Sequence, residues 1–251
     1  MYIHSHLNFY QYKRKTIQNQ KNIYLYIITC LITDSKGDCV KRVSPSIGRF
    51  EIISKKGTNF ADNDFIRSVA EKIKEDNKPI ILFWFGTCEL TAKKGKYIYI
   101  RQPPYQNIER CLTEAREAKE KLLRANKEAK IIFLDCPYYS TIKYNNKTSN
   151  RTVHPIRGNL KLTAINNKTI SVNDLKLNKA VDYYNSQLLL LNNVVTPKFG
   201  IDILAPTKRA IYKVTKYRKN FNLYYDGVHP IRPLSKLWLY RILNFANTLQ
   251  D

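Results

Sequence analysis

The residues of this chain that could do chemistry are a serine near its start and an aspartate–histidine pair near its end. Ser35 lies in the run TDSKG, and Asp226 and His229 lie in the run YDGVHP. A serine hydroxyl is a weak nucleophile until a histidine takes its proton, and a carboxylate can orient that histidine. Together, Ser35, Asp226 and His229 predict nucleophilic hydrolysis of an ester if the fold brings the two segments together.

Elements that could position these residues follow a regular alternation. Apolar runs of strand length occupy residues 23–33, 50–53, 79–86, 130–135 and 201–205. Stretches of helical character occupy residues 64–76, 105–129, 172–193 and 231–248. Strands that alternate with helices imply a parallel sheet covered on both faces. We therefore expect an α/β fold, a three-layer α/β/α sandwich with a mostly parallel, flavodoxin-like sheet of about five strands.

The candidate residues lie where such a sheet binds ligands, at the carboxyl ends of its strands. Ser35 follows the first expected strand, Gly57 follows the second, and Cys88 follows the third. Asp226 and His229 directly precede the last expected helix. The alternation therefore predicts that these residues share one edge of the sheet.

In this order the motifs resemble those of the SGNH (GDSL-type) hydrolase superfamily, over about residues 23–248. The nucleophile block of that superfamily usually reads Gly-Asp-Ser and here reads Thr-Asp-Ser, ending at Ser35. Its last block, Asp-x-x-His, is matched by Asp226 and His229. The resemblance implies an esterase acting on an acyl or acetyl ester of a lipid, sugar or small molecule, with no metal or organic cofactor. Ser35 would attack, His229 would act as general base and then acid, and Asp226 would orient His229.

The resemblance also implies an oxyanion hole, formed by the backbone N–H groups of Ser35 and Gly57 and by a third donor. The superfamily takes this donor from the asparagine of Gly-x-Asn, but here the block reads Gly-Thr-Cys, ending at Cys88. A thiol is a poor hydrogen-bond donor, and loss of one oxyanion donor can cost roughly 3–4 kcal/mol of transition-state stabilisation. Thr87, Asn59 or a backbone N–H could substitute. The chain is therefore predicted to be either a weakened esterase or a catalytically inactive pseudoenzyme.

Each motif also has an ordinary structural explanation. Asp-Ser-x-Gly and Asp-Gly are common turn sequences, so Ser35 could simply cap a turn. His229 could merely help to begin the last helix. A catalytic alternative, in which Cys88 is the nucleophile and pairs with His229, is less favoured. The coincidence of the motifs in one order favours the shared fold more strongly than it favours catalysis.

The charge of the chain supports a second function. Lys and Arg number 43 against 20 Asp and Glu, giving a formal net charge of +23. Such an excess is typical of proteins that meet a polyanion, although a biased composition with a solvated surface would give the same number. The alternative function is therefore an SGNH-like domain of weak or no catalysis that binds RNA or DNA. Its contacts would come from cations interleaved with tyrosines, which suit phosphates and bases: Lys208, Arg209, Tyr212, Lys213, Lys216, Tyr217, Arg218 and Lys219.

Organisation and compartment follow from the remaining sequence. Residues 1–22 are expected to form a basic arm, 23–251 a single domain, and 139–170 a polar insertion or mobile loop within it. The five cysteines form no CxxC pair, which excludes a disulfide framework and a zinc site and favours a reducing, intracellular compartment, cytoplasmic or nuclear. The apolar run at 23–32 is too short to span a bilayer, so no transmembrane segment is expected.

Overall fold

A parallel sheet of four strands forms the centre of the computed structural model, which describes residues 29–44, 50–150, 167–199 and 221–250. Its strands are β1 (Thr29–Thr33), β2 (Phe50–Ser54), β3 (Ile80–Trp84) and β6 (Lys130–Phe133). They lie in the order β2-β1-β3-β6. After β1 the chain goes to one edge of the sheet and then returns past β1 to β3. The gap between β1 and β3 is therefore the point where ligands bind in folds of this kind.

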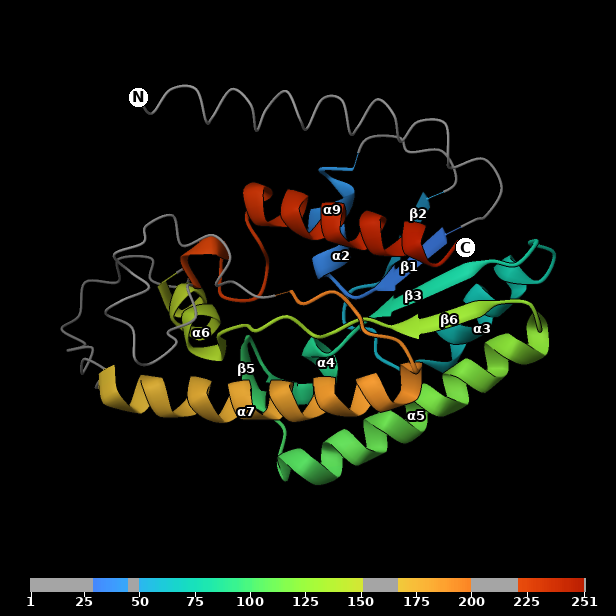
Figure 1. Ribbon diagram of the computed structural model, residues 1–251. Helices are drawn as coiled ribbons and strands as arrows, with labels where there is room; N and C mark the ends of the chain where they lie inside the picture. Colours follow the sequence, from blue (N-terminus) through green and yellow to red (C-terminus); the bar gives the residue numbers. More distant parts are fainter. Residues whose placement is uncertain (1–28, 45–49, 151–166, 200–220, 251) are drawn as a thin grey trace, which may run out of the picture.

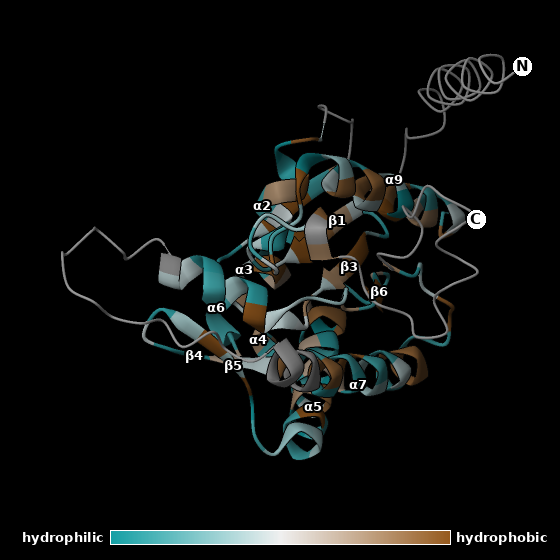
Figure 2. Cartoon of the chain, turned by 90° about the vertical axis from the view of Figure 1, so that its left-hand side faces the viewer, coloured by the Kyte–Doolittle hydropathy of each residue, from teal (hydrophilic) through white to brown (hydrophobic). Residues whose placement is uncertain are grey.

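Helices cover both faces of this sheet (Figure 1). On one face lie α2 (Lys36–Lys41) and α9 (Arg232–Thr248), and on the other lie α3 (Asn63–Ile73), α5 (Pro104–Ala125) and α7 (Asn167–Asn192). Figure 2 shows the same three layers from the side, with apolar residues concentrated where the helices meet the strands. The predicted fold class, an α/β sandwich with a mostly parallel sheet, is confirmed.

Aromatic side chains fill the core on both sides of the sheet. The ring of Phe60 packs edge-on against Phe83 and Phe133, with ring centroids 5.5 and 5.4 Å apart. Trp84, the next residue along β3, points to the opposite face and meets Trp238 of α9 with centroids 5.2 Å apart. Alternation of side chains along a strand buried on both faces explains why β3 is apolar throughout.

Several expected segments lie outside the described residues. These are the basic arm at 1–22, the fifth strand at 201–205 and the basic stretch at 208–219. Residues 23–28 of the first expected strand and 151–166 of the expected insertion also lie outside the described residues. The other expected strands and helices are present, with ends that differ by a few residues. In the described part of the chain, no helix is long and apolar enough to cross a membrane.

The alternative of a mobile loop does not hold for residues 141–150 of the expected insertion. This stretch forms helix α6 (Thr141–Asn150), which packs on the hairpin of β4 (Thr91–Lys94) and β5 (Tyr97–Ile100). The side chain of Asn145 accepts a hydrogen bond from the N–H of Ile98 and donates one to its carbonyl, at 2.9 and 2.8 Å. The polar composition hid this helix, because it is held by such contacts more than by an apolar face.

Candidate active site

The segment that carries Ser35 is a tight turn between β1 and α2. The hydroxyl of Thr33 donates to the carbonyl of Trp84 at 3.1 Å, which ties together the ends of β1 and β3. The N–H of Gly37 donates to the carbonyl of Asp34 at 3.0 Å and closes the turn. A Cβ at Gly37 would lie 1.9 Å from the Thr33 side chain, so the turn requires a glycine there. This geometry presents Ser35 at the carboxyl edge of the sheet.

A second turn, just before α9, carries Asp226 and His229. One carboxylate oxygen of Asp226 accepts the backbone N–H groups of Val228 and His229, at 3.1 and 2.8 Å. Gly227 has a φ of +94°, a conformation that favours glycine. The N–H of Tyr225 donates to the carbonyl of His229 at 2.7 Å and closes the loop. The Asp-Gly turn signal and the Asp-x-x-His motif are therefore one structure.

Helix α6 holds this second turn in place. The N–H of Ser140, directly before α6, donates to the carbonyl of Gly227 at 2.8 Å. The Lys143 ammonium donates to the carbonyls of Phe221 and Tyr224 at 2.7 and 2.9 Å. A Cβ at Gly227 would lie 2.5 Å from the Ser140 carbonyl oxygen, so the two segments are in close contact. The position of His229 therefore depends on a region that the sequence predicted to be a polar insertion or mobile loop.

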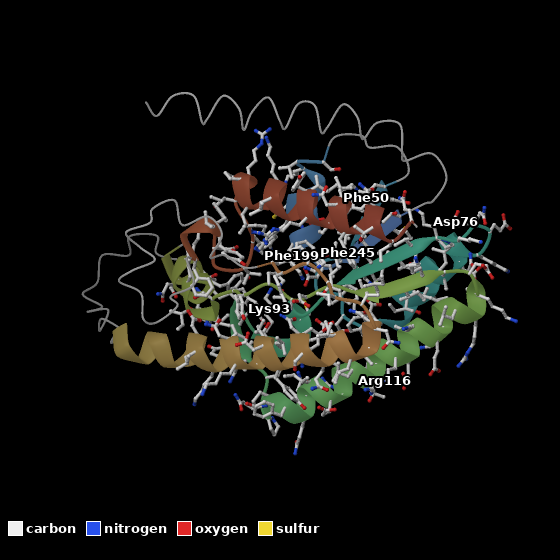
Figure 3. All side chains as sticks on the ribbon, viewed as in Figure 1. Phe50, Asp76, Lys93, Arg116, Phe199 and Phe245 are labelled. Carbon is white, nitrogen blue, oxygen red and sulfur yellow. The ribbon has the colours of Figure 1, made fainter. Side chains whose placement is uncertain are left out.

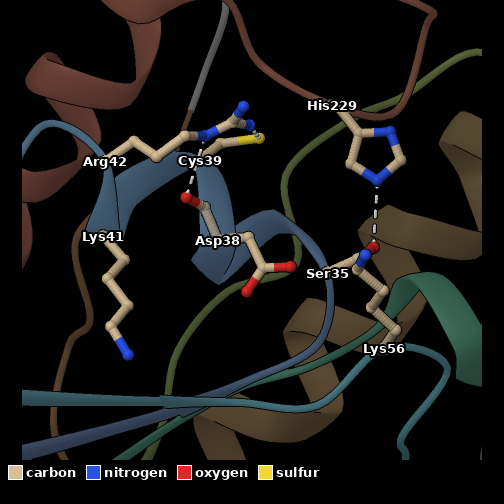
Figure 4. Close-up of a pocket in the computed structure, with 7 residues that line it drawn as sticks. All are labelled: Ser35, Asp38, Cys39, Lys41, Arg42, Lys56 and His229. Carbon is tan, nitrogen blue, oxygen red and sulfur yellow. Dashed lines mark hydrogen bonds between the residues drawn. The ribbon is translucent and has the colours of Figure 1, made fainter.

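The two turns bring the three predicted catalytic residues together, and Figure 4 shows the contact between Ser35 and His229. The Oγ of Ser35 lies 3.0 Å from Nε2 of His229, and Nδ1 of His229 lies 2.8 Å from Oδ2 of Asp226. Ser35 precedes α2 at its N-cap, yet its hydroxyl makes no capping hydrogen bond. Its hydroxyl faces His229 instead, and α9 has Ile231 as its N-cap. The ordinary structural explanations for Ser35 and His229 therefore do not describe this arrangement.

Asp226 is suited to stay ionised in this arrangement. Burial by itself would raise the pKa of Asp226, but the hydrogen bonds from the His229 side chain and backbone outweigh it and hold this pKa below its usual value. An ionised carboxylate at 2.8 Å from Nδ1 favours the histidine tautomer that carries its proton on Nδ1. Nε2 is then free to accept the Ser35 proton.

A pocket of about 600 Å³ opens beside Ser35 and His229. Its other lining residues are charged or polar: Asp38, Cys39, Lys41, Arg42 and Lys56. Figure 4 shows the Lys56 side chain extending toward the Ser35–His229 pair. A second cavity of about 850 Å³ shares Cys39, Arg42 and His229 with the first. The candidate nucleophile is therefore accessible to a ligand of moderate size.

Behind Ser35 lies a group of buried charges that we call the buried charge cluster: Asp34, Lys36 and Glu89. The Lys36 ammonium lies 2.7 Å from Oδ2 of Asp34, and both side chains are 1% exposed. Burial would lower the pKa of Lys36, but the negative charge of Asp34 raises it above its usual value. Lys36 is therefore charged at neutral pH although it is fully buried.

Glu89 is the third member of this cluster. Its Oε2 accepts the N–H of Gly86 at 2.8 Å, whereas its Oε1 has no hydrogen-bond partner among the described residues. Burial, and then the negative charge of Asp34, raise the pKa of Glu89 to about 7. Neither Lys36 nor Glu89 is among the site residues that the sequence predicted. A lysine within a turn carries no sequence signal for burial.

The predicted oxyanion residues lie at the ends of the expected strands. Gly57 follows Lys56 in an exposed loop with a φ of +75°, and Cys88 lies in α4 (Thr87–Leu90), directly after β3. Among the described residues, neither of them lines the pocket of Ser35. The Asn59 side chain accepts the N–H of Ala61 at 3.1 Å, which is a turn contact. The oxyanion roles of Gly57 and Cys88 stay predictions.

Cys88 is poorly suited to act as the nucleophile itself. Burial, and then the negative charges of Asp34 and Glu89, raise the pKa of its thiol to about 12. A thiol with such a pKa is almost entirely protonated at neutral pH, whereas the reactive form is the thiolate.

In the described part of the chain, no group of His, Cys, Asp or Glu side chains could hold a metal ion.

Comparison with solved structures identifies the fold. The chain is similar to an acetyl xylan esterase, AlAXEase, at 12% sequence identity and a TM-score of 0.50, with 86% of this chain and 98% of that chain covered. It also matches a member of the lipolytic protein G-D-S-L family from Veillonella parvula DSM 2008, at 12% identity and a TM-score of 0.43, with 87% and 97% covered. A lipase/acylhydrolase from Enterococcus faecalis matches at 13% identity and a TM-score of 0.44, with 88% and 96% covered. No protein-family model matches the sequence, and no curated protein matches it. At an identity this low, the structural likeness to the acetyl xylan esterase shows a shared fold and does not show a shared activity.

Proposed function

We propose that this protein is a serine ester hydrolase of the SGNH type, acting on an acyl or acetyl ester. The observation that carries the proposal is the chain of hydrogen bonds from Ser35 through His229 to Asp226, at the edge of the sheet where such folds bind ligands. The pocket beside Ser35 gives an ester access to the hydroxyl. The acetyl xylan esterase that shares the fold is consistent with this chemistry.

In the proposed reaction, Nε2 of His229 takes the Ser35 proton while Oγ attacks the carbonyl carbon of the ester. The resulting tetrahedral intermediate collapses, and His229 gives its proton to the departing alcohol. A water molecule then repeats the two steps on the acyl-serine, releasing the acid and restoring Ser35. Asp226 keeps the histidine oriented and stabilises its positive charge without itself becoming protonated.

The proposed oxyanion hole has one donor weaker than is usual in this type of site. The backbone N–H groups of Ser35 and Gly57 would donate to the oxyanion, and Cys88 would stand where a stronger donor is usual. Because a thiol is a poor donor, we expect turnover to be slow. Binding of RNA or DNA through residues 208–219 stays a prediction, since those residues lie outside the described part of the chain.

Hydrolysis of p-nitrophenyl acetate by the purified protein tests the proposal. Substituting Ser35→Ala removes the nucleophile, and we expect kcat/KM to fall by at least about 1000-fold. Ser68→Ala is the matched control, because Ser68 lies exposed on α3, on the opposite face of the sheet from α2. Equal turnover by the wild type and Ser35→Ala would contradict the proposal for this substrate.

The same assay tests the oxyanion position. Cys88→Asn restores the side-chain amide that is usual in this motif, and one such donor is worth about 10²–10³ in kcat. We expect kcat to rise by at least about tenfold in Cys88→Asn. An unchanged or lower kcat in a folded Cys88→Asn protein would show that Cys88 does not face the oxyanion.

A further inference from the structure

The pocket beside Ser35 is lined mainly by positive charge. Three cations lie around it, Lys41, Arg42 and Lys56, and we call them the cationic rim. All three are exposed. One carboxylate also lines the pocket, that of Asp38, and it accepts a hydrogen bond from the Ser54 hydroxyl. The pocket therefore carries an excess of positive charge close to the candidate nucleophile.

Arg42 is held in a fixed orientation at the end of α2. Its Nε donates to the Asp38 carbonyl at 3.2 Å, and one terminal nitrogen donates to Sγ of Cys39 at 3.1 Å. A guanidinium has five N–H donors, so these two contacts leave three that described residues do not engage. A guanidinium whose position is already fixed loses little conformational entropy when it binds a carboxylate or phosphate.

The two lysines of the rim have no internal partner in the described part of the chain. No described carboxylate lies within ion-pair distance of Lys41 or Lys56. The neighbouring Lys55 differs, because its ammonium lies 2.7 Å from Oδ2 of Asp62. Of two adjacent lysines, one is neutralised by the protein and the other, which lines the pocket, is available for a ligand.

We propose that the ester hydrolysed at Ser35 carries an anionic group, such as a carboxylate or phosphate, near the bond that is cleaved. This inference rests on the proposed function and names its substrate class. A cleft lined by one sign of charge concentrates ligands of the opposite charge, and arginine binds planar anions through paired hydrogen bonds. An ester of a neutral acid with a neutral alcohol offers this rim no negative charge to pair with. A pocket of about 600 Å³ has room for the reacting group and the anion together.

Matched pairs of chromogenic esters test the inference. On the leaving-group side, p-nitrophenyl acetate is compared with 5-acetoxy-2-nitrobenzoate, which has the same acyl group and an added carboxylate. On the acyl side, p-nitrophenyl hexanoate is compared with the mono-p-nitrophenyl ester of adipic acid. We expect at least one anionic ester to exceed its neutral partner by about tenfold in kcat/KM at 50 mM NaCl, mainly through a lower KM. The preference should shrink in 500 mM NaCl, which screens exposed charges.

Variants then locate the preference on the rim. Arg42→Gln and Lys56→Gln should each lower the anionic-to-neutral ratio of kcat/KM by about 1.5- to fivefold, the range of one exposed ion pair. Arg116→Gln and Lys127→Gln are the controls and should leave the ratio unchanged. Arg116 lies exposed on α5, on the other face of the sheet (Figure 3), and Lys127 lies exposed in the loop that leads into β6, at the opposite edge.

The outcomes separate this inference from the proposed function. A preference that the rim variants reduce and the controls do not supports the inference. Turnover that depends on Ser35 but shows no anionic preference on either side overturns the inference and leaves the proposed function standing. If no ester is hydrolysed faster by the wild type than by Ser35→Ala, the proposed function fails and the inference fails with it.

Discussion

Two groups of charge lie on either side of Ser35, and the protein treats them in opposite ways. In the buried charge cluster, Lys36 is 1% exposed and its ammonium contacts Asp34 at 2.7 Å. In the cationic rim, Lys56 is exposed and has no described carboxylate partner. Water stabilises the rim charges without help, whereas a charge away from water needs a partner inside the protein. The comparison shows that lysines close to one serine can have unrelated roles.

The buried charge cluster contains two carboxylates and one ammonium, so one carboxylate has no ion-pair partner within the cluster. Asp34 and Lys36 balance one another, which leaves Glu89 as the excess carboxylate. Its pKa of about 7 follows first from burial and then from the negative charge of Asp34. Folding therefore favours a proton on Glu89 at pH values below about 7, where the cluster as a whole is close to neutral.

Removing the buried and the exposed lysine by the same substitution gives the largest expected contrast. Lys36→Met leaves Asp34 buried without its partner, and breaking a buried pair in this way typically costs about 3–5 kcal/mol. Lys56→Met changes an exposed side chain and should alter the free energy of unfolding by less than about 0.5 kcal/mol. Urea denaturation followed by circular dichroism measures both. Equal stability of the two variants would remove the distinction between cluster and rim.

Glu89 provides a prediction of intermediate size, through pH. Its pKa is about 7 in the folded protein and 4.5 is its ordinary value, so the folded state binds more protons between these two values. The free energy of unfolding should therefore fall as pH rises from about 5 to about 8, by about 3 kcal/mol for this group. Glu89→Gln keeps an acceptor for the Gly86 N–H and removes the titration, so its stability should lack this fall.

The control for this measurement is Glu117→Gln, because Glu117 is exposed on α5. Its stability should follow the wild-type pH profile. Parallel profiles for the wild type and Glu89→Gln would mean that Glu89 is not the proton-binding member of the cluster.

The smallest effect concerns the exposed pair beside the rim. Lys55→Gln removes the ion pair between Lys55 and Asp62. The Lys55 side chain is 48% exposed, so this loss should lower the free energy of unfolding by less than about 1 kcal/mol. In 0.5 M NaCl the loss should disappear, since salt screens exposed charges. The loss in Lys36→Met should persist in the same salt. Similar salt sensitivity of the two variants would contradict the assigned difference in burial.

Strand alternation is local and predicted the sheet. The order of the motifs, and their places at the carboxyl ends of the strands, predicted that Ser35 meets Asp226 and His229. At Gly37 the steric reason is local, because a Cβ there would meet Thr33. At Gly227 the positive φ of its turn is local, whereas the close contact with Ser140 comes from a distant segment. Helix α6 and the buried Lys36 could not be predicted in this way. Both depend on partners that are contributed by distant segments or by burial, and a polar residue looks the same in sequence whether its partner is water or protein.

Helix α6 offers a route by which the geometry of this site can change during evolution. It holds the turn of His229 through the Gly227 carbonyl and through two carbonyls bound by Lys143. None of the residues that line the Ser35 pocket belongs to α6 in the described part of the chain. Substitutions in α6 can therefore move the base relative to the nucleophile by small steps while every residue of the pocket is inherited unchanged.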